Sequence, residues 1–205
     1  WSSDVCSSDL YNPPVYNENK INIRSVFEKG GMCFYVTPKN ASVKEYFMFL
    51  HGGGFVSQMS RNEWRFVLDT VESTGYGAVV PVYPIAPDHS AAEAVDMLAG
   101  AYEKLCEKED ANRIVLIGDS SGACLALSVA IQLWKTGIRR PDKLILCSPV
   151  LDTEFEDREL EQEMGDRRKF VYGYYYTPEI RSFLRQYWVK DSEGKVDVTS
   201  PVYSD

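Results

Sequence analysis

The sequence contains very little histidine, and its cysteines lack the short spacings typical of metal sites. There are two histidines, His51 and His89, and five cysteines without a CxxC pair. A structural zinc site needs about four such ligands at short spacings, so we expect no metal. Leaving aside Cys6, three of the other four cysteines lie in apolar segments. This indicates reduced, buried thiols and favours a cytoplasmic location.

Long apolar runs and an excess of basic residues are also missing. No stretch approaches the roughly 20 apolar residues of a membrane-spanning helix, so we expect no membrane span. Lys and Arg total 22 against 30 Asp and Glu, a net charge of −8. This acidic balance argues against nucleic acid and anionic membranes as partners. The chain is long enough for one domain with a sizeable core.

The first ten residues differ in character from the rest. They run from Trp1 to Leu10 and are rich in serine, and one back-translation of them matches a common sequencing adapter. We therefore expect residues 1–10 to be an artefact, with the natural sequence starting near Tyr11 and its true N-terminus missing. A Ser-rich disordered start is the alternative. A signal peptide is left open.

Strand-like and helix-like segments alternate along the natural part, residues 11–205, without an internal repeat. Short apolar runs are typical of buried strands, and amphipathic segments with capping signals follow them. This alternation predicts an α/β fold: a mostly parallel central sheet with helices on both faces and a site at the carboxyl ends of the strands. The expected strands are 21–27, 32–36, 46–50, 76–83, 113–117 and 143–147, and the expected helices are 62–73, 90–108 and 121–135.

Residues 149–191 do not follow this alternation, and we interpret them as a lid-like or cap-like excursion over the sheet. The acidic run 154–166 is typical of a solvated helix face, and Pro178 marks a helix start. Most of the aromatic residues here are expected to pack the core or the lid, whereas a few could line an apolar pocket. They are Phe170, Tyr172, Tyr174, Tyr175, Tyr176, Phe183, Tyr187 and Trp188.

The turn Gly118-Asp119-Ser120-Ser121-Gly122 has the G-x-S-x-G pattern of a nucleophile elbow. An apolar strand precedes Ser120 and an apolar helix follows it, which is the context that this motif requires. A serine hydroxyl needs a neighbouring base to become a nucleophile, and a helix N-terminus offers N–H groups to a developing oxyanion. Ser120 is thus the candidate nucleophile. A Gly-rich turn with a capping serine is the structural alternative.

The second candidate element is the glycine loop that follows the strand 46–50. Acyl transfer passes through a tetrahedral oxyanion, and glycines let backbone N–H groups approach it closely. Gly52, Gly53 and Gly54 are therefore the candidate oxyanion donors, together with the N–H of Ser121. A flexible hairpin loop is the alternative.

Together these motifs resemble the hormone-sensitive-lipase-like branch of the α/β-hydrolases. His51-Gly52-Gly53-Gly54-Phe55 resembles the family's HGGG motif, residues 83–89 its YxxAPxH segment and residues 118–122 its GDSAG elbow. Residues 148–152 resemble its SPWLD stretch, and Ser200-Pro201 its later SP turn. The resemblance covers about Met32 to Asp205, and Ser121 replaces the usual alanine.

The resemblance also implies which parts of the site the sequence does not contain. In this family the acid and the histidine of the triad follow the later SP turn, so we expect both beyond Asp205. The family gives the histidine of the HGGG loop a structural task, and likewise that of the YxxAPxH segment, so neither His51 nor His89 is expected to be the base. We expect Asp119 to point away from the hydroxyl. The chain as it stands should have little turnover.

The resemblance implies a carboxylesterase that cleaves esters of short or medium acyl chains through an acyl-enzyme at Ser120. Its partner is a small-molecule ester, and it needs no cofactor. One alternative is an inactive homologue that binds a small molecule, and another is an acyltransferase.

Overall fold

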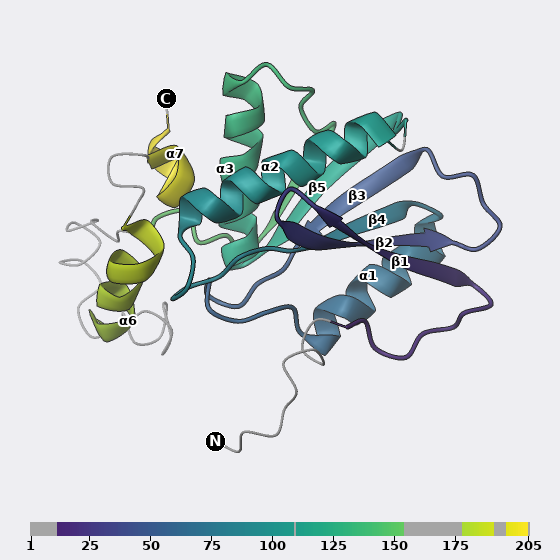
Figure 1. The fold of residues 1–205 in the computed structure, drawn as a ribbon, viewed down its shortest axis with the longest axis horizontal. Helices are drawn as coiled ribbons and strands as arrows, with labels where there is room; N and C mark the ends of the chain where they lie inside the picture. Colours follow the sequence, from purple (N-terminus) through teal and green to yellow (C-terminus); the bar gives the residue numbers. More distant parts are fainter. Residues whose placement is uncertain (1–11, 109, 154–177, 191–195, 205) are drawn as a thin grey trace.

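The structure is a computed structural model that describes residues 12–108, 110–153, 178–190 and 196–204. Across these residues, six strands form one sheet in the order β1-β2-β4-β3-β5-β6 (Figure 1). Neighbouring strands from β4 to β6 run parallel, and β1 and β2 add an antiparallel edge. The predicted α/β fold class is therefore confirmed. The strands are β1 (Ile21–Glu28), β2 (Gly31–Pro38), β3 (Glu45–Leu50), β4 (Gly77–Val82), β5 (Arg113–Asp119) and β6 (Lys143–Cys147).

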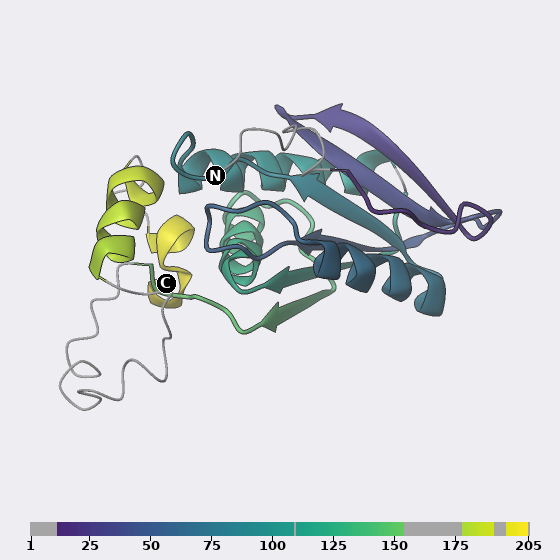
Figure 2. The ribbon, with the colours of Figure 1, turned by 90° about the horizontal axis from the view of Figure 1, so that it is seen from below.

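Helices cover both faces of the sheet, α1 on one and α2 with α3 on the other (Figure 2). Strand β3 shows how the sequence divides between them, because alternate side chains point to opposite faces. Tyr46, Met48 and Leu50 join the core under α2 and α3, whereas Phe47 and Phe49 join the core under α1. The helices are α1 (Arg61–Thr74), α2 (Ala91–Lys108) and α3 (Ser121–Lys135).

The element boundaries follow local signals in the sequence. Helix α1 begins with a capping box, in which the Ser60 side chain accepts from the N–H of Glu63 and the Glu63 side chain accepts from the N–H of Ser60. It ends at Gly75, whose φ of 77° is the left-handed conformation that glycine adopts easily. The predicted strands and helices are confirmed, with their ends shifted by one to a few residues.

Strand order brings the two glycine motifs together. From β3 the chain passes through α1 to β4 on one side, then through α2 to β5 on the other side of β3. Strands β3 and β5 are thus neighbours, and Leu50 pairs with Gly118. The loop after β3 and the turn after β5 consequently leave the sheet side by side, at the kind of switch point where α/β sheets bind ligands.

Helical segments near the end of the chain pack beside the carboxyl edge of the sheet (Figure 1). The helix predicted at Pro178 is confirmed, and Trp188 of the next segment is buried with its ring 4.8 Å from that of Phe55. The acidic run 154–166 and the aromatic residues 170–176 lie outside the described residues. The segments are α6 (Pro178–Phe183), the π-helical turn η4 (Leu184–Val189), α7 (Val196–Thr199) and the 3-10 turn η5 (Pro201–Tyr203).

The two serine–proline motifs of the sequence meet in space. The N–H of Thr153 donates to Oγ of Ser200 at 3.1 Å, and Oγ1 of Thr153 donates to the carbonyl of Thr199 at 2.6 Å. The Ser200 hydroxyl in turn donates to Oδ1 of Asp152 at 3.2 Å. These bonds fasten the chain after β6 to a segment 47 positions later.

Candidate active site

Ser120 occupies a strained turn between strand β5 and helix α3. Its backbone has φ 52° and ψ −118°, a region that L-residues rarely adopt. A Cβ atom at Gly118 would lie 2.3 Å from the carbonyl oxygen of Gly122, and one at Gly122 would lie 2.2 Å from the carbonyl oxygens of Leu50 and His51. Both glycines are therefore required for the strand and the helix to pass this closely.

Backbone hydrogen bonds hold this strained turn in place. The N–H of Ser120 donates to the carbonyl of Cys147 at 2.8 Å, and the carbonyl of Ser120 accepts from Ala123 at 3.0 Å. The first bond ties the turn to the end of β6 and the second closes the first turn of α3. The half-buried Ser120 is thus fixed from two sides at the carboxyl edge of the sheet.

The glycine loop lies directly against Ser120. A Cβ atom placed on Gly52 would be 3.3 Å from the Cβ of Ser120 and 3.1 Å from Oδ2 of Asp119. Beyond Gly52 the chain turns sharply, and the Gly53 carbonyl accepts from the N–H of Val56 at 3.2 Å. Gly53 and Gly54 have φ values of 121° and 62°, which a side chain would strain.

Both backbone groups of Gly52 are occupied. Its N–H donates to Oε1 of Glu63 at 2.6 Å, and its carbonyl accepts from Nδ1 of His51 at 2.7 Å. The other oxygen of Glu63 accepts from the N–H of Ser60 at 2.7 Å. One carboxylate on α1 therefore joins the start of that helix to the glycine loop.

His51 supports the loop from within the core. Its ring is buried and stacks on the Tyr83 ring with the centroids 4.2 Å apart. The Tyr83 hydroxyl donates to the backbone carbonyl of His51 at 2.6 Å. Burial lowers the pKa of His51, while the Gly52 carbonyl, the Glu63 charge and the Gln58 side chain oppose that shift. The ring is thus neutral near pH 7.

The other histidine lies away from the elbow. His89 is half-exposed ahead of α2, with Nδ1 3.5 Å from the Glu93 carboxylate. Among the residues that the structure describes, no imidazole forms a hydrogen bond with the Ser120 hydroxyl. The triad acid and histidine expected beyond Asp205 remain predictions.

Asp119 lies close to Gly52, because a Cβ atom placed on Gly52 would be 3.1 Å from its Oδ2. Burial raises the pKa of Asp119, and the nearby charge of Glu63 raises it further. The Glu63 charge is thus close enough to act on Asp119, which faces Gly52.

Three of the predicted donor residues keep their N–H groups unused. In the described part of the chain, neither Gly53 nor Gly54 donates its N–H to a hydrogen bond. Ser121 is the first residue of α3, and the first N–H groups of a helix have no carbonyl acceptor within that helix. Gly53 and Gly54 are exposed, whereas Gly52 is buried. The structure thus places all five predicted site residues, Ser120, Gly52, Gly53, Gly54 and Ser121, around one edge of the sheet.

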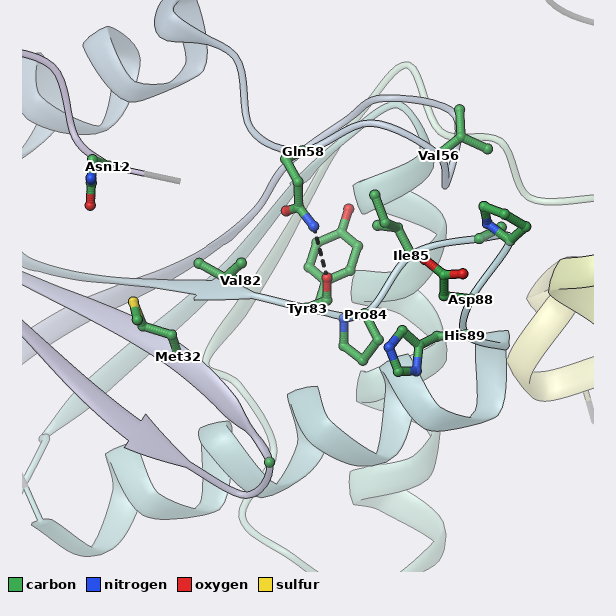
Figure 3. A pocket seen from close by; sticks show the side chains of 13 residues that line it. Asn12, Met32, Val56, Gln58, Val82, Tyr83, Pro84, Ile85, Asp88 and His89 are labelled. Carbon is green, nitrogen blue, oxygen red and sulfur yellow. Dashed lines mark hydrogen bonds between the residues drawn. The ribbon is translucent and has the colours of Figure 1, made fainter. Parts of the chain in front are cut away.

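A pocket of about 680 Å³ lies beside the segment that follows β4 (Figure 3). Its lining includes Val56 and Gln58 of the loop after the glycines and the stretch from Tyr83 to His89. Ser120 is not among the described residues that line this pocket, so the pocket is separate from the elbow.

The described residues contain neither a metal-binding cluster nor a membrane-spanning helix. Within these ranges, no group of three His, Cys, Asp or Glu side chains is arranged to hold a metal ion. None of the helices in the same ranges is both long and apolar enough to cross a bilayer.

Two residues at the site were missed by sequence reasoning. Glu63 carries a visible signal, because Ser60 and Glu63 have the S-x-x-E spacing of a capping box. That pattern predicts the bond to Ser60 but not the bond to Gly52, which depends on how α1 packs. Tyr83 belongs to a recognised motif, yet nothing in the sequence indicates that its hydroxyl reaches His51.

Comparison with known proteins identifies similar chains. A family model described as an alpha/beta hydrolase fold matches residues 47–205. An esterase of Acinetobacter venetianus is 32% identical over 113 residues, which are 55% of this chain and 37% of that protein. Human hormone-sensitive lipase is 31% identical over 117 residues, which are 55% of this chain and 11% of that protein.

Solved structures agree on the fold. A thermostable esterase from Pseudomonas putida has a TM-score of 0.74 at 22% identity, covering 94% of this chain and 61% of its own. The chain therefore spans less than two thirds of the length of each of these relatives.

Proposed function

The chain belongs to the alpha/beta hydrolase fold family, in its hormone-sensitive-lipase-like branch, and from that premise we propose that it is a serine carboxylic-ester hydrolase with Ser120 as its nucleophile. Esters of short and medium acyl chains are the proposed substrates. The esterase and lipase names of its relatives support ester hydrolysis as the reaction class.

The observation that carries this proposal is the contact between the glycine loop and the elbow. Gly52 lies against Ser120, and Gly53 and Gly54, whose N–H groups are the proposed donors, follow it directly in the loop. An oxyanion hole needs preorganised N–H donors close to the attacked carbonyl. The Gly52 N–H already binds Glu63, so we assign the oxyanion to Gly53, Gly54 and Ser121 and give Gly52 the task of fixing the loop.

The reaction then follows acyl-transfer chemistry. The Ser120 oxygen bonds to the ester carbonyl carbon while a base takes the hydroxyl proton, and the three N–H groups stabilise the resulting oxyanion. The C–O bond to the alcohol breaks as the alcohol receives that proton, which leaves an acyl-enzyme. Water then hydrolyses the acyl-enzyme and restores Ser120. The base is the histidine that we expect beyond Asp205, oriented by an acid from the same region.

The test is ester hydrolysis by the full-length product of the natural gene, with p-nitrophenyl acetate and butyrate as substrates. Replacing Ser120 with alanine should lower kcat on the order of 10⁴-fold or more. The matched control is Ser73→Ala, an exposed serine of α1 far along the chain from the elbow. It should keep the original rate.

Three outcomes separate this proposal from its alternatives. An active protein that keeps its rate after Ser120→Ala would contradict Ser120 as the nucleophile. A full-length gene product without a histidine after the later SP turn, and without activity, would favour a small-molecule-binding homologue. Ester transfer to an added alcohol faster than hydrolysis would favour an acyltransferase.

A further inference from the structure

A small cavity lies behind the glycine loop, between the end of β3 and the first turn of α1. Its lining includes His51, Trp64 and Gln58, with β4 residues behind them. The volume within which the centre of a water molecule can lie is about 10 Å³. That is room for one water molecule and not for several. The cavity is part of the core, because His51 is 1% exposed and Trp64 is 2% exposed.

Two buried nitrogens belong to the side chains that line this cavity. Nε2 of His51 and Nε1 of Trp64 are both inaccessible to solvent, and neither has a hydrogen-bond partner within the described ranges. A buried polar atom without a partner costs about 1–3 kcal/mol, so native proteins rarely contain one. Two such atoms at the same cavity indicate a shared partner.

The hydrogen-bonding roles of the two nitrogens are complementary. The indole nitrogen of Trp64 can only donate. Nδ1 of His51 lies 2.7 Å from the carbonyl of Gly52, which can only accept, so Nδ1 carries the proton of the neutral ring. Nε2 of His51 is therefore an acceptor. One group that accepts from Trp64 and donates to His51 satisfies both.

We propose that one buried water molecule occupies this cavity, accepting from Nε1 of Trp64 and donating to Nε2 of His51. Buried waters need two to four polar partners, and the amide of Gln58 supplies a third. Nε2 of that amide donates to the carbonyl of Tyr83 at 3.5 Å (Figure 3), so its oxygen is left to accept the second water proton. The site takes water in preference to larger ligands because of its size.

This water fixes the tautomer of His51 and joins α1 to the glycine loop. With Nε2 accepting from water, the ring proton stays on Nδ1, where it binds the Gly52 carbonyl. Glu63 holds the N–H of Gly52 from the same helix. The rival arrangement is a direct bond from a protonated Nε2 to the Gln58 amide oxygen, because a hydrogen bond with that side chain raises the pKa of His51. The water site does not depend on the proposed esterase activity.

The first test uses nuclear magnetic resonance on the whole chain labelled with ¹⁵N. The chain has four tryptophans, and Trp64→Phe identifies the Trp64 indole signal by its loss. The Trp64 N–H should show a cross-peak to water with the sign of a long-lived contact in both NOE and ROE spectra. Trp134, which is 56% exposed, is the internal control and should show only contacts with bulk water. No such cross-peak from Trp64 in the folded chain would overturn the proposal.

The second test reads the nitrogens of His51 directly. Long-range ¹H–¹⁵N spectra should show a protonated Nδ1 and an unprotonated, hydrogen-bonded Nε2. Trp64→Phe should shift the Nε2 signal, because the water loses its donor. Gln58→Leu should leave the cross-peak between Trp64 and water in place. A protonated Nε2 in the wild type, donating to the Gln58 oxygen, would establish the direct Gln58 contact instead.

A crystal structure that resolves ordered waters gives an independent readout if Trp64→Phe fails to fold. One density peak within hydrogen-bonding distance of both nitrogens is expected. A cavity without density, or a Gln58 amide bonded to Nε2, would contradict the proposal.

Discussion

The carboxylate of Glu63 accepts a hydrogen bond of 2.6 Å from the backbone N–H of Gly52, a residue 11 positions earlier. Through it the first turn of α1 holds the loop that touches Ser120. Across the described residues, Glu63 forms no hydrogen bond with the proposed nucleophile or the proposed oxyanion donors, so its role in the proposed reaction is to position the loop.

Replacing Glu63 should lower both stability and kcat in the full-length protein. Glu63→Ala removes a charge-assisted hydrogen bond, which is worth about 1.5–3 kcal/mol. The released loop should lower kcat by up to about 100-fold, with a smaller effect on KM, because small displacements of an oxyanion site have effects of this size. Glu63→Gln keeps an oxygen acceptor for Gly52 and should recover part of the rate.

The chain offers a matched control for this change. Glu93 accepts from the N–H of Ser90 at 2.7 Å at the start of α2, as Glu63 does from Ser60 in α1, but within the described residues it forms no hydrogen bond with the glycine loop. Glu93→Ala should lower the melting temperature and leave kcat unchanged. Equal kcat losses in the two variants would show that Glu63 acts only as a helix cap.

The buried imidazole of His51 should make folding stability depend on pH. Its pKa is lowered in the folded protein, whereas an unfolded histidine titrates near 6.5. Below that pH the unfolded chain takes up a proton that folded His51 does not. Stability should therefore be full above about pH 6.5 and fall as the pH drops, by at most about 1.4 kcal/mol per pH unit.

Urea unfolding between pH 7.5 and pH 5 measures this effect. In His51→Asn the decline over this range should be smaller than in the wild type. His89→Asn, at the other, half-exposed histidine, is the variant for comparison. If the decline disappears in His89→Asn instead, the pH dependence comes from His89 and not from His51.

Gly122→Ala should destabilise the elbow strongly. The new methyl group would meet the backbone oxygens of Leu50 and His51, which cannot rotate away. Overpacking of this kind costs about 1–3 kcal/mol or more. Gly100→Ala, also in a helix, first meets side-chain carbons of Lys29, which can move more easily than backbone oxygens, and it gains helix propensity. Thermal unfolding of the pair should show a loss for the first variant and little change or a gain for the second.

The thiols should differ widely in reactivity. Cys124 is buried, and burial raises its pKa to about 12, so almost no thiolate forms at pH 8. Cys147 is exposed and should react first. Alkylation in a Cys6→Ser background, followed by peptide mass mapping, checks this order. Faster labelling of Cys124 than of Cys147 would mean that α3 opens readily.

Much of the fold is readable in the sequence because its signals are local. Gly75 ends α1 and the apolar spacing of α2 is helical, so the helices were predicted closely. The pairing of β2 with β4 was not predicted, because strand order depends on contacts between residues far apart. The same limit applies to the site. Ser120 and the glycines carry motifs, whereas the bond from Glu63 to Gly52 arises from the packing of α1 on the sheet.

The bonds between Thr153 and Ser200 have a consequence for how such a protein can diversify. The chain leaves the sheet after β6 and is fastened again at nearly the same point 47 positions later. The span between these residues therefore begins and ends at one place in the fold, and its buried Trp188 packs on Phe55. A segment of different length could replace this span between the two anchors without moving the strands, provided that it still supplies an apolar side chain against Phe55.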